Sequence, residues 1–166
     1  GTQRRRPGGS TVKGMLGLVD RAKEPDAVHP VNLGRRVAGV SGELTPRLPC
    51  TRGGIVGLLR RNDVPMAGRH VAVVGRGLTV GRPLGLLLTR LEATATLTHS
   101  LTADVAAECR RADIVVAAAG VAGLVKPDWV QPGAAVIDVG ITRVVNDETG
   151  KAQLHGVVDP AVASGA

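Results

Sequence analysis

Short apolar runs, each bounded by glycine or polar residues, recur through the second half of the chain. They occupy residues 70–74, 95–98, 113–120 and 134–140. Runs of this length, rich in valine, isoleucine and alanine, are typical of β-strands, and the first and third are apolar enough to be buried on both faces of a sheet. The pattern therefore predicts four strands.

Helical patterns alternate with these runs. From Gly54 onward, Ile55, Leu58 and Leu59 form an apolar stripe, which the polar residues 60–62 close. Further helices are predicted over residues 84–91, with Pro83 in the first turn, over about 104–111 and, as a short piece, over 127–130. Strands that alternate with helices specify a parallel sheet covered on both sides. The predicted fold class is therefore α/β, with a Rossmann-like doubly wound parallel sheet.

The composition fits one globular domain and narrows the chemistry. The chain has 166 residues, 43% of them hydrophobic, with one Trp and neither Tyr nor Phe. A chain of this length can bury a core built from small aliphatic side chains. The lack of tyrosine excludes every mechanism that needs a phenol as acid, base or stacking surface. Cys50 and Cys109 are isolated, without metal-ligand or CxxC spacing, so we expect free structural thiols and no metal site.

The positive charge is concentrated near the beginning of the sequence. The formal net charge is +7, and residues 1–19, which lack any sustained period, contain Arg4, Arg5, Arg6 and Lys13 but no acid. With Trp129 as the sole aromatic residue, a solvated basic lead-in is favoured over a nucleic-acid-binding face. No apolar run reaches about 18 residues, and the N-terminus is polar, so we expect neither a membrane span nor a secretory signal. The expected location is the cytoplasm.

A glycine-rich loop joins the first predicted strand to the helix that follows it. Gly75, Gly77 and Gly81 are spaced as GxGxxxG. At the first strand-to-helix turn of such a sheet, glycines permit a tight turn and a close approach to a pyrophosphate, and the helix start attracts anions. The loop is interpreted as a nucleotide site, with a turn that is glycine-rich for steric reasons only as the alternative.

The end of the second predicted strand bears on the choice of nucleotide. Sites specific for NAD usually carry an acid there, which accepts from the ribose 2′-hydroxyl. This chain has Thr98, His99 and Ser100 instead, while Arg76 lies in the glycine loop. A guanidinium and a hydroxyl could together bind a 2′-phosphate, which favours NADP. The alternatives are a solvated surface arginine and, at His99 and Ser100, an ordinary strand-end turn.

Four segments are similar, in order, to the motifs of a single enzyme family. Residues 23–35, KEPDAVHPVNLGR, resemble K-D-x-D-G-x-H-P-x-N-x-G-R, and residues 49–55, PCTRGGI, resemble P-C-T-P-x-G-I. Residues 73–83, VVGRGLTVGRP, resemble V-G-R-S-x-x-V-G-R-P, and residues 132–141, PGAAVIDVGI, resemble P-G-A-V-V-I-D-V-G-I. The family is the bifunctional methylenetetrahydrofolate dehydrogenase/methenyltetrahydrofolate cyclohydrolases. The resemblance runs from about Val19 to Asp159.

The resemblance implies a two-domain enzyme in which an NADP domain docks against a catalytic domain, with the folate between them. Carried onto matching positions, it implies that NADP is held by Gly75, Arg76, Gly77, Ser100 and Ile141. On the folate side it implies Asp26 as the partner of the pterin donors, and Cys50 and Thr51 as residues lining the cleft.

The implied reaction is the NADP-dependent oxidation of 5,10-methylenetetrahydrofolate to 5,10-methenyltetrahydrofolate and its hydrolysis to 10-formyltetrahydrofolate. This is one-carbon metabolism, which serves purine, histidine and methionine biosynthesis. The resemblance also implies a homodimer, with tetrahydrofolate derivatives as substrates and no nucleic-acid or membrane partner.

The departures from the family pattern limit what the resemblance implies. The family's Tyr-xxx-Lys pair, whose lysine serves the cyclohydrolase step, has no counterpart, so no catalytic residue is assigned. The sequence also ends before the family's P-x-P-G-G-V-G-P-x-T loop, and we therefore expect a chain truncated at both ends relative to the family. Single replacements by comparison with the motifs are Arg52 for proline, Ala27 for glycine, Gly77 for serine, Thr142 for asparagine and Val157 for aspartate.

The sequence divides into a lead-in (1–19), a remnant of the catalytic domain and linker (20–48), the NADP-binding domain (49–160) and a tail (161–166). The favoured interpretation is a portion of the folate enzyme that binds NADP but turns over poorly by itself. A non-catalytic nucleotide-binding or dimer-interface module is the alternative. A relative of shikimate dehydrogenase is a third interpretation, but it does not account for the segments around Asp26 and Cys50.

Overall fold

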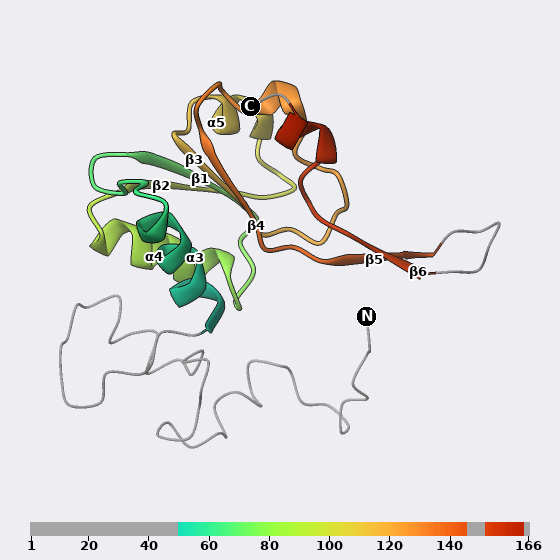
Figure 1. Ribbon diagram of the computed structural model, residues 1–166, viewed down its shortest axis with the longest axis horizontal. Helices are drawn as coiled ribbons and strands as arrows, with labels where there is room; N and C mark the ends of the chain where they lie inside the picture. The colour runs from blue at the N-terminus through green and yellow to red at the C-terminus, as the bar shows by residue number, and fades with distance from the viewer. Residues whose placement is uncertain (1–49, 146–151, 165–166) are drawn as a thin grey trace, which may run out of the picture.

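A computed structural model of the chain describes residues 50–145 and 152–164 (Figure 1). The lead-in, the segment 20–48 and Asp26 lie outside these residues. Helices and strands alternate along the described chain, as the apolar pattern predicts. The elements are α3 (Cys50–Arg61), β1 (His70–Val74), α4 (Gly81–Arg90), β2 (Thr94–Thr98), α5 (Val105–Arg110), β3 (Ile114–Ala117), the 3-10 helix η1 (Pro127–Trp129), β4 (Ala135–Asp138), β5 (Thr142–Val145), β6 (Ala152–His155) and the 3-10 helix η2 (Pro160–Ser164).

The first four strands form one parallel sheet in the order β2-β1-β3-β4. β1 and β3 lie at the centre, and from the second residue of β1 onward every residue of the two strands is buried. β2 and β4 lie at the edges and are only partly buried, because one side of an edge strand lacks a neighbour. The predicted α/β fold class with a Rossmann-like parallel sheet is confirmed.

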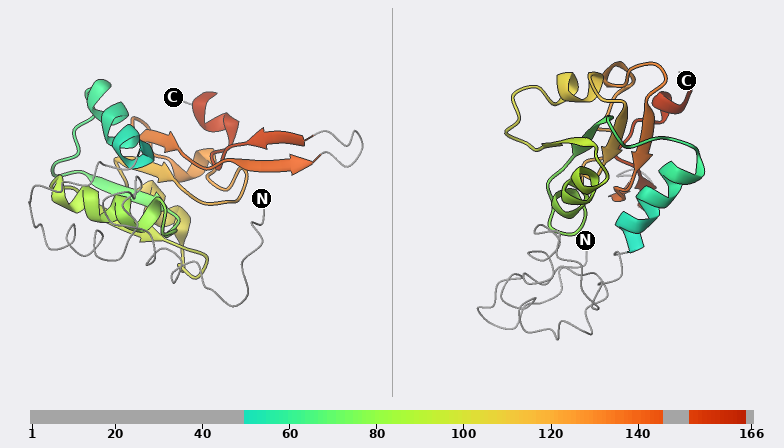
Figure 2. Two further views of the ribbon diagram at one scale, coloured as in Figure 1. Left: turned by 90° about the horizontal axis from the view of Figure 1, so that it is seen from below. Right: turned by 90° about the vertical axis from the view of Figure 1, so that its left-hand side faces the viewer.

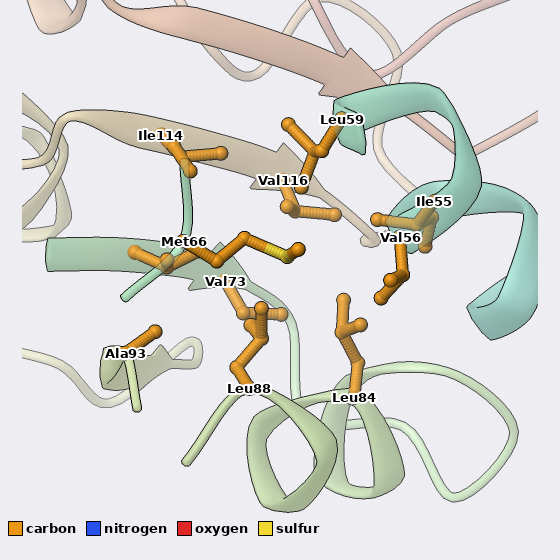
Figure 3. Close-up of a cluster of buried hydrophobic side chains, with 11 residues drawn as sticks. Ile55, Val56, Leu59, Met66, Val73, Leu84, Leu88, Ala93, Ile114 and Val116 are labelled. Carbon is orange, nitrogen blue, oxygen red and sulfur yellow. The ribbon is translucent and has the colours of Figure 1, made fainter. Parts of the chain in front are cut away.

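Helices cover both faces of this sheet, and α5 lies on the face opposite to α3 and α4 (Figure 2). The α3/α4 side is closed by a cluster of buried side chains that includes Ile55, Val56, Leu59, Val73, Leu84, Leu88, Ile114 and Val116. In this cluster the leucines of α4 and the apolar side chains of α3 converge on the central strands (Figure 3). The α5 side is closed by Ala72, Val74, Cys109, Ala112, Val115, Ala117, Val125 and Val157. The aliphatic side chains that alternate along β1 and β3 therefore serve both layers.

The first described helix differs from its prediction in two ways. α3 begins at Cys50, four residues before the predicted start at Gly54, so Cys50 and Thr51 lie in a helical first turn rather than in a chain turn. Val56 is buried beside Ile55 and Leu59, whereas Leu58 is 52% exposed. The prediction that Leu58 belongs to the buried stripe is wrong, because the core-facing side of the helix runs through Arg52, Val56 and Leu59, at spacings of four and three residues.

An antiparallel hairpin of β5 and β6 follows the sheet and projects away from it (Figure 1). The apolar pattern did not predict it. All four residues of β6 are exposed, so this strand lacks the buried face that produces a strong alternation of apolar and polar positions.

After the hairpin the chain returns to the sheet and is tied there by backbone hydrogen bonds. Gly123 N donates to Gly156 O at 3.0 Å, and Val125 N donates to Val157 O at 3.0 Å. The Asp138 carboxylate, at the end of β4, accepts from Gly140 N at 3.0 Å and from Val158 N at 2.8 Å. These bonds fix the returning segment against the carboxyl end of β4.

Asp159 gives this segment a predicted dependence on pH. A hydrogen bond from Ala161 N and one from Lys126 Nζ lower the pKa of Asp159 below its usual value. A carboxyl whose pKa is lower in the folded state stabilises the fold above its unfolded pKa of about 4, and this contribution is lost as the pH falls. We expect Asp159→Asn to flatten the decline in melting temperature below about pH 4. Differential scanning calorimetry between acid and neutral pH tests this, and a variant that declines as steeply as the parent chain would contradict it.

Candidate functional site

The order of the strands creates a switch point at the carboxyl ends of β1 and β3. The chain moves from β1 to β2 on one side, and then to β3 on the other side of β1. In open α/β sheets, ligands bind where the strand order reverses in this way, outside the carboxyl ends of the strands. The predicted glycine loop, which follows β1, lies at this position.

Gly75 holds the loop against the neighbouring strand. Its φ is +118°, and a Cβ at this position would lie 2.5 Å from the carbonyl oxygen of Ala118, just after β3. Both the backbone conformation and the close approach require glycine here. The loop therefore turns away from β1 directly over the end of β3.

The other two glycines of the loop differ in what they do. A Cβ on Gly81, the first residue of α4, would collide with the carbonyl oxygen of Gly75, so the helix start packs directly on the loop. Gly77 has no left-handed φ, and the nearest atom to a Cβ there, Thr79 Oγ1, is 4.0 Å away. The protein's own packing therefore requires glycine at Gly75 and Gly81 but not at Gly77.

Two arginines flank the loop, and both are exposed. Arg76 follows Gly75 directly, and Arg82 lies in the first turn of α4, where its backbone N–H donates to Gly77 O at 3.1 Å. Val80, at the N-cap of α4, makes no side-chain capping bond. The loop thus combines positive charge with the uncapped start of a ten-residue helix, an arrangement that attracts anions.

A backbone hydrogen bond joins the glycine loop to the end of β2. Gly75 N donates to Thr98 O at 3.1 Å, and Thr98 is fully buried. Arg76 is the next residue after Gly75, and Ser100, which is exposed, lies two residues after Thr98. The structure therefore brings together the two segments that carry Arg76 and Ser100.

Ile141 lies at the end of β4, on the other side of β3. Its side chain is 75% exposed. The preceding Gly140 packs so closely that a Cβ there would lie 2.6 Å from Ala119 O and would also collide with Val157. Ile141 is thus placed at the same edge of the sheet as Gly75 and Ser100, separated from the glycine loop by the end of β3.

Thr51 and Cys109 have separate environments. Thr51 is exposed in the first turn of α3, and no hydrogen bond connects it with the glycine loop. Cys109 is a free, buried thiol, as predicted. Desolvation by burial, together with Glu108, raises the pKa of Cys109 to about 11, so the thiol is unreactive near neutral pH.

Two kinds of feature are absent from residues 50–145 and 152–164. No group of three or more His, Cys, Asp or Glu side chains in these ranges could hold a metal ion. No helix in the same ranges is long and apolar enough to cross a membrane.

Sequence reasoning missed two contributors to this edge of the sheet, the Ala118 carbonyl and the Asp138 carboxylate. The turn formed by residues 99–102, which stands among the alternatives for His99 and Ser100, also shapes it. Contacts between residues 75 and 118 span 43 positions and leave no local signal. For the turn a signal existed, because Ser and Thr beside His at a strand end favour hydrogen-bonded turns.

Comparisons with known proteins agree with this fold. The family model described as tetrahydrofolate dehydrogenase/cyclohydrolase, NAD(P)-binding domain, matches residues 49–165. Among solved structures, the Trypanosoma brucei methylenetetrahydrofolate dehydrogenase-cyclohydrolase, complexed with NADP and an inhibitor, is similar at 38% identity and a TM-score of 0.82, over 95% of this chain and 53% of that one.

Two further solved structures are similar to the chain. The Campylobacter jejuni bifunctional enzyme matches at 32% identity and a TM-score of 0.81, over 93% of this chain and 52% of that one. The dehydrogenase of the silkworm, Bombyx mori, matches at 30% identity and a TM-score of 0.80, over 98% of this chain and 56% of that one. The chain thus spans about half the length of these structures.

Proposed function

Because the chain belongs to the tetrahydrofolate dehydrogenase/cyclohydrolase family through its NAD(P)-binding domain, we propose that it binds NADP as the cofactor-binding part of a methylenetetrahydrofolate dehydrogenase. The observation that carries the proposal is the hydrogen bond between Gly75 N and Thr98 O, which joins the loop bearing Arg76 to the strand end bearing Ser100. The proposed reaction is oxidation of 5,10-methylenetetrahydrofolate, followed by hydrolysis of the methenyl product to 10-formyltetrahydrofolate.

The residues of the site fit a dinucleotide. The conformation of Gly75 and the contact between Gly81 and Gly75 O bring the loop close to the start of α4 without side chains between them. At the start of α4, Arg82 N already donates to Gly77 O and Pro83 has no N–H, so the positive end of the helix dipole and the exposed guanidinium groups of Arg76 and Arg82 are what suit a pyrophosphate. Ile141, exposed beyond β4, would contact the nicotinamide side, and Gly77 would lie beside the phosphates. When bound, the cofactor supplies the hydride acceptor, while the protein supplies orientation and electrostatics.

Arg76 and Ser100 favour NADP over NAD. A guanidinium offers paired donors to a phosphate, and a hydroxyl adds a further donor. No carboxylate lies at positions 98–100, where NAD-specific sites carry an acid, so nothing in this turn repels a 2′-phosphate.

The test is calorimetric titration of the chain with NADP and with NAD. We expect tighter binding of NADP, and a loss of about tenfold or more in NADP affinity for Arg76→Ala, because a charge-assisted hydrogen bond contributes roughly 1.5–3 kcal/mol. Arg90→Ala, at the far end of α4, is the matched control and should leave both affinities unchanged. A chain that binds neither nucleotide would overturn the proposal.

Gly77→Ser should strengthen NADP binding. The position has room for a Cβ and no left-handed φ, so the substitution introduces no strain, and it adds a hydroxyl beside the loop. One additional hydrogen bond corresponds to about 0.5–1.5 kcal/mol, or roughly a two- to tenfold gain in affinity. Gly77→Ala fills the same space without a donor and serves as the control in the titration. Equal affinities for the serine and alanine variants would show that the hydroxyl makes no contact.

For the folate side, we propose that Asp26, Cys50 and Thr51 line the substrate cleft, with the Asp26 carboxylate accepting from the pterin donors. A dehydrogenase assay with 5,10-methylenetetrahydrofolate, followed by the absorbance of the reduced cofactor, addresses the activity. We expect NADP binding without measurable turnover by these 166 residues alone, since they span about half the length of the solved structures they match.

A homodimer is also proposed, with the β5–β6 hairpin as the contact. Leu154 on β6 is 71% exposed, and an isolated two-stranded hairpin is only marginally stable in water, so a covering surface would stabilise it. Light scattering after size exclusion should give a dimer for the parent chain and a monomer for Leu154→Glu. Leu58→Glu, at a leucine exposed elsewhere, is the control and should remain dimeric. A dimeric Leu154→Glu variant would exclude the hairpin as the contact.

A further inference from the structure

The segment that follows β2 is closed into a turn by three hydrogen bonds. His99 N donates to Thr102 Oγ1 at 2.9 Å, Thr102 N donates to His99 O at 2.9 Å, and Leu101 N donates to His99 Nδ1 at 3.2 Å. Each bond has His99 at one end, and together they enclose Ser100. The bonds of His99 with Leu101 and Thr102 therefore fix the backbone on both sides of Ser100, without a bond from the Ser100 side chain.

In the third bond the ring of His99 takes the place of an acceptor side chain. The backbone N–H of Leu101 donates to Nδ1. An acceptor on the side chain of residue i that receives the N–H of residue i+2 is the geometry of an Asx-turn, which asparagine and aspartate form with their side-chain oxygen. His99 thus acts as a substitute for asparagine in this turn.

The turn is anchored to the glycine loop on its other side. Thr98, which directly precedes it, accepts from Gly75 N at 3.1 Å, and its hydroxyl donates to Val73 O at 3.5 Å. The loop that carries Arg76 and the turn that carries Ser100 are consequently joined by a single backbone hydrogen bond, from Gly75 N to Thr98 O. Ser100 and the adjacent Leu101, which is 82% exposed, are held out at the carboxyl edge of β2.

We propose that His99 and Thr102 are positioning residues for recognition of the ribose 2′-phosphate. They fix the turn that carries Ser100, which the bond from Gly75 N to Thr98 O joins to the loop that carries Arg76, before the cofactor arrives, so binding does not have to order this turn. The inference rests on the proposed function, because it assigns a role within the same NADP site. It goes further in making the discrimination between NADP and NAD depend on two residues that do not themselves contact the phosphate.

The experiment titrates the chain and its variants with 2′,5′-ADP and with 5′-AMP, which differ in the 2′-phosphate. We expect His99→Ala and Thr102→Val each to weaken binding of 2′,5′-ADP by about five- to tenfold, the effect of losing one hydrogen-bonded ordering contact, and to change 5′-AMP binding by less than about twofold. His99→Asn should recover most of the loss, because its side-chain oxygen can accept the Leu101 N–H. Thr89→Val removes a threonine bond to Leu86 O on the exposed side of α4 and should change neither affinity.

The outcomes separate the inference from the function on which it rests. If the parent chain binds neither probe, nor NADP, the proposed function is overturned and the inference with it. If the parent chain prefers 2′,5′-ADP but His99→Ala binds both probes as the parent does, or loses both equally, the inference alone is overturned. Failure of His99→Asn to recover binding, with the variant folded by circular dichroism, would likewise overturn it.

Discussion

Replacing Gly75 by alanine is expected to destabilise the protein by about 3 kcal/mol, because the substitution combines backbone strain with a steric clash. At a φ of +118° an L-residue is strained whatever the space around it. The new methyl group would in addition lie 2.5 Å from Ala118 O, which is backbone at the end of a central strand and has little freedom to move. Relief of the clash requires a shift of the loop or a separation of β1 from β3.

Urea unfolding monitored by circular dichroism measures this loss. Gly77→Ala, two residues along the same loop, is the control and should change the free energy of unfolding by less than about 0.5 kcal/mol, because its Cβ position is open. The same pair of variants reports on function, since a displaced loop should also lose nucleotide affinity while the control keeps it. Equal stabilities for the two variants would contradict the geometry assigned to Gly75.

Replacing Val157 by aspartate should destabilise the fold by about 4 kcal/mol, since a carboxylate would be buried without a partner. Val157 is fully buried in the cluster on the α5 side of the sheet, and its side chain packs on Gly140. The family motif carries aspartate at the matching position, so the substitution would introduce the family residue into a core that is apolar in this chain. We expect the apolar surroundings of residue 157 in this chain to determine the stability of the variant, even though aspartate is the family residue.

The destabilisation should depend on pH in a defined direction. Burial raises the pKa of an introduced carboxyl, so the folded variant holds its proton at a pH where the unfolded chain has lost it. The variant should therefore be least destabilised below about pH 4, and progressively more so as the pH rises toward neutrality. Leu154→Asp, at an exposed position, is the matched control in the unfolding measurement and should show no such trend. A Val157→Asp variant as stable as the parent chain at neutral pH would indicate that the site admits water or a cation.

The central part of the fold could be predicted from the sequence because its signals are local. β1 and β3 are continuous apolar runs, and the predicted bounds of β1 agree with the structure. The start of α3 was placed too late, because the residues Cys50 to Gly53 carry no apolar stripe. The hairpin was missed for a related reason. The residues of β6, AQLH, are all exposed and give no apolar alternation, although the sequence between the two strands, with Asn, Asp and Gly, is typical of a turn.

The candidate site was predictable in its parts but not in its assembly. The glycine spacing located the loop, and the missing acid after β2 indicated the nucleotide. The packing requires glycine at Gly75 because of the Ala118 carbonyl oxygen, and at Gly81 because of the Gly75 carbonyl oxygen. The sequence pattern does not reveal either of these contacts. Likewise, His99 and Ser100 could be interpreted as an ordinary strand-end turn. The hydrogen bonds of His99 show an organised turn, and whether it recognises phosphate stays a prediction.

The Asp138 carboxylate has a consequence for how this sequence can vary. The carboxylate accepts a hydrogen bond from Gly140 N before the hairpin and another from Val158 N after it. One side chain therefore fixes both the point where the chain leaves the sheet and the point where it returns. A longer connection between these two bonds then adds mainly loop-closure entropy, which grows by roughly 0.6 kcal/mol for each doubling of length. A change in the length of the chain that joins β5 to β6 is accordingly expected to leave the parallel sheet undisturbed.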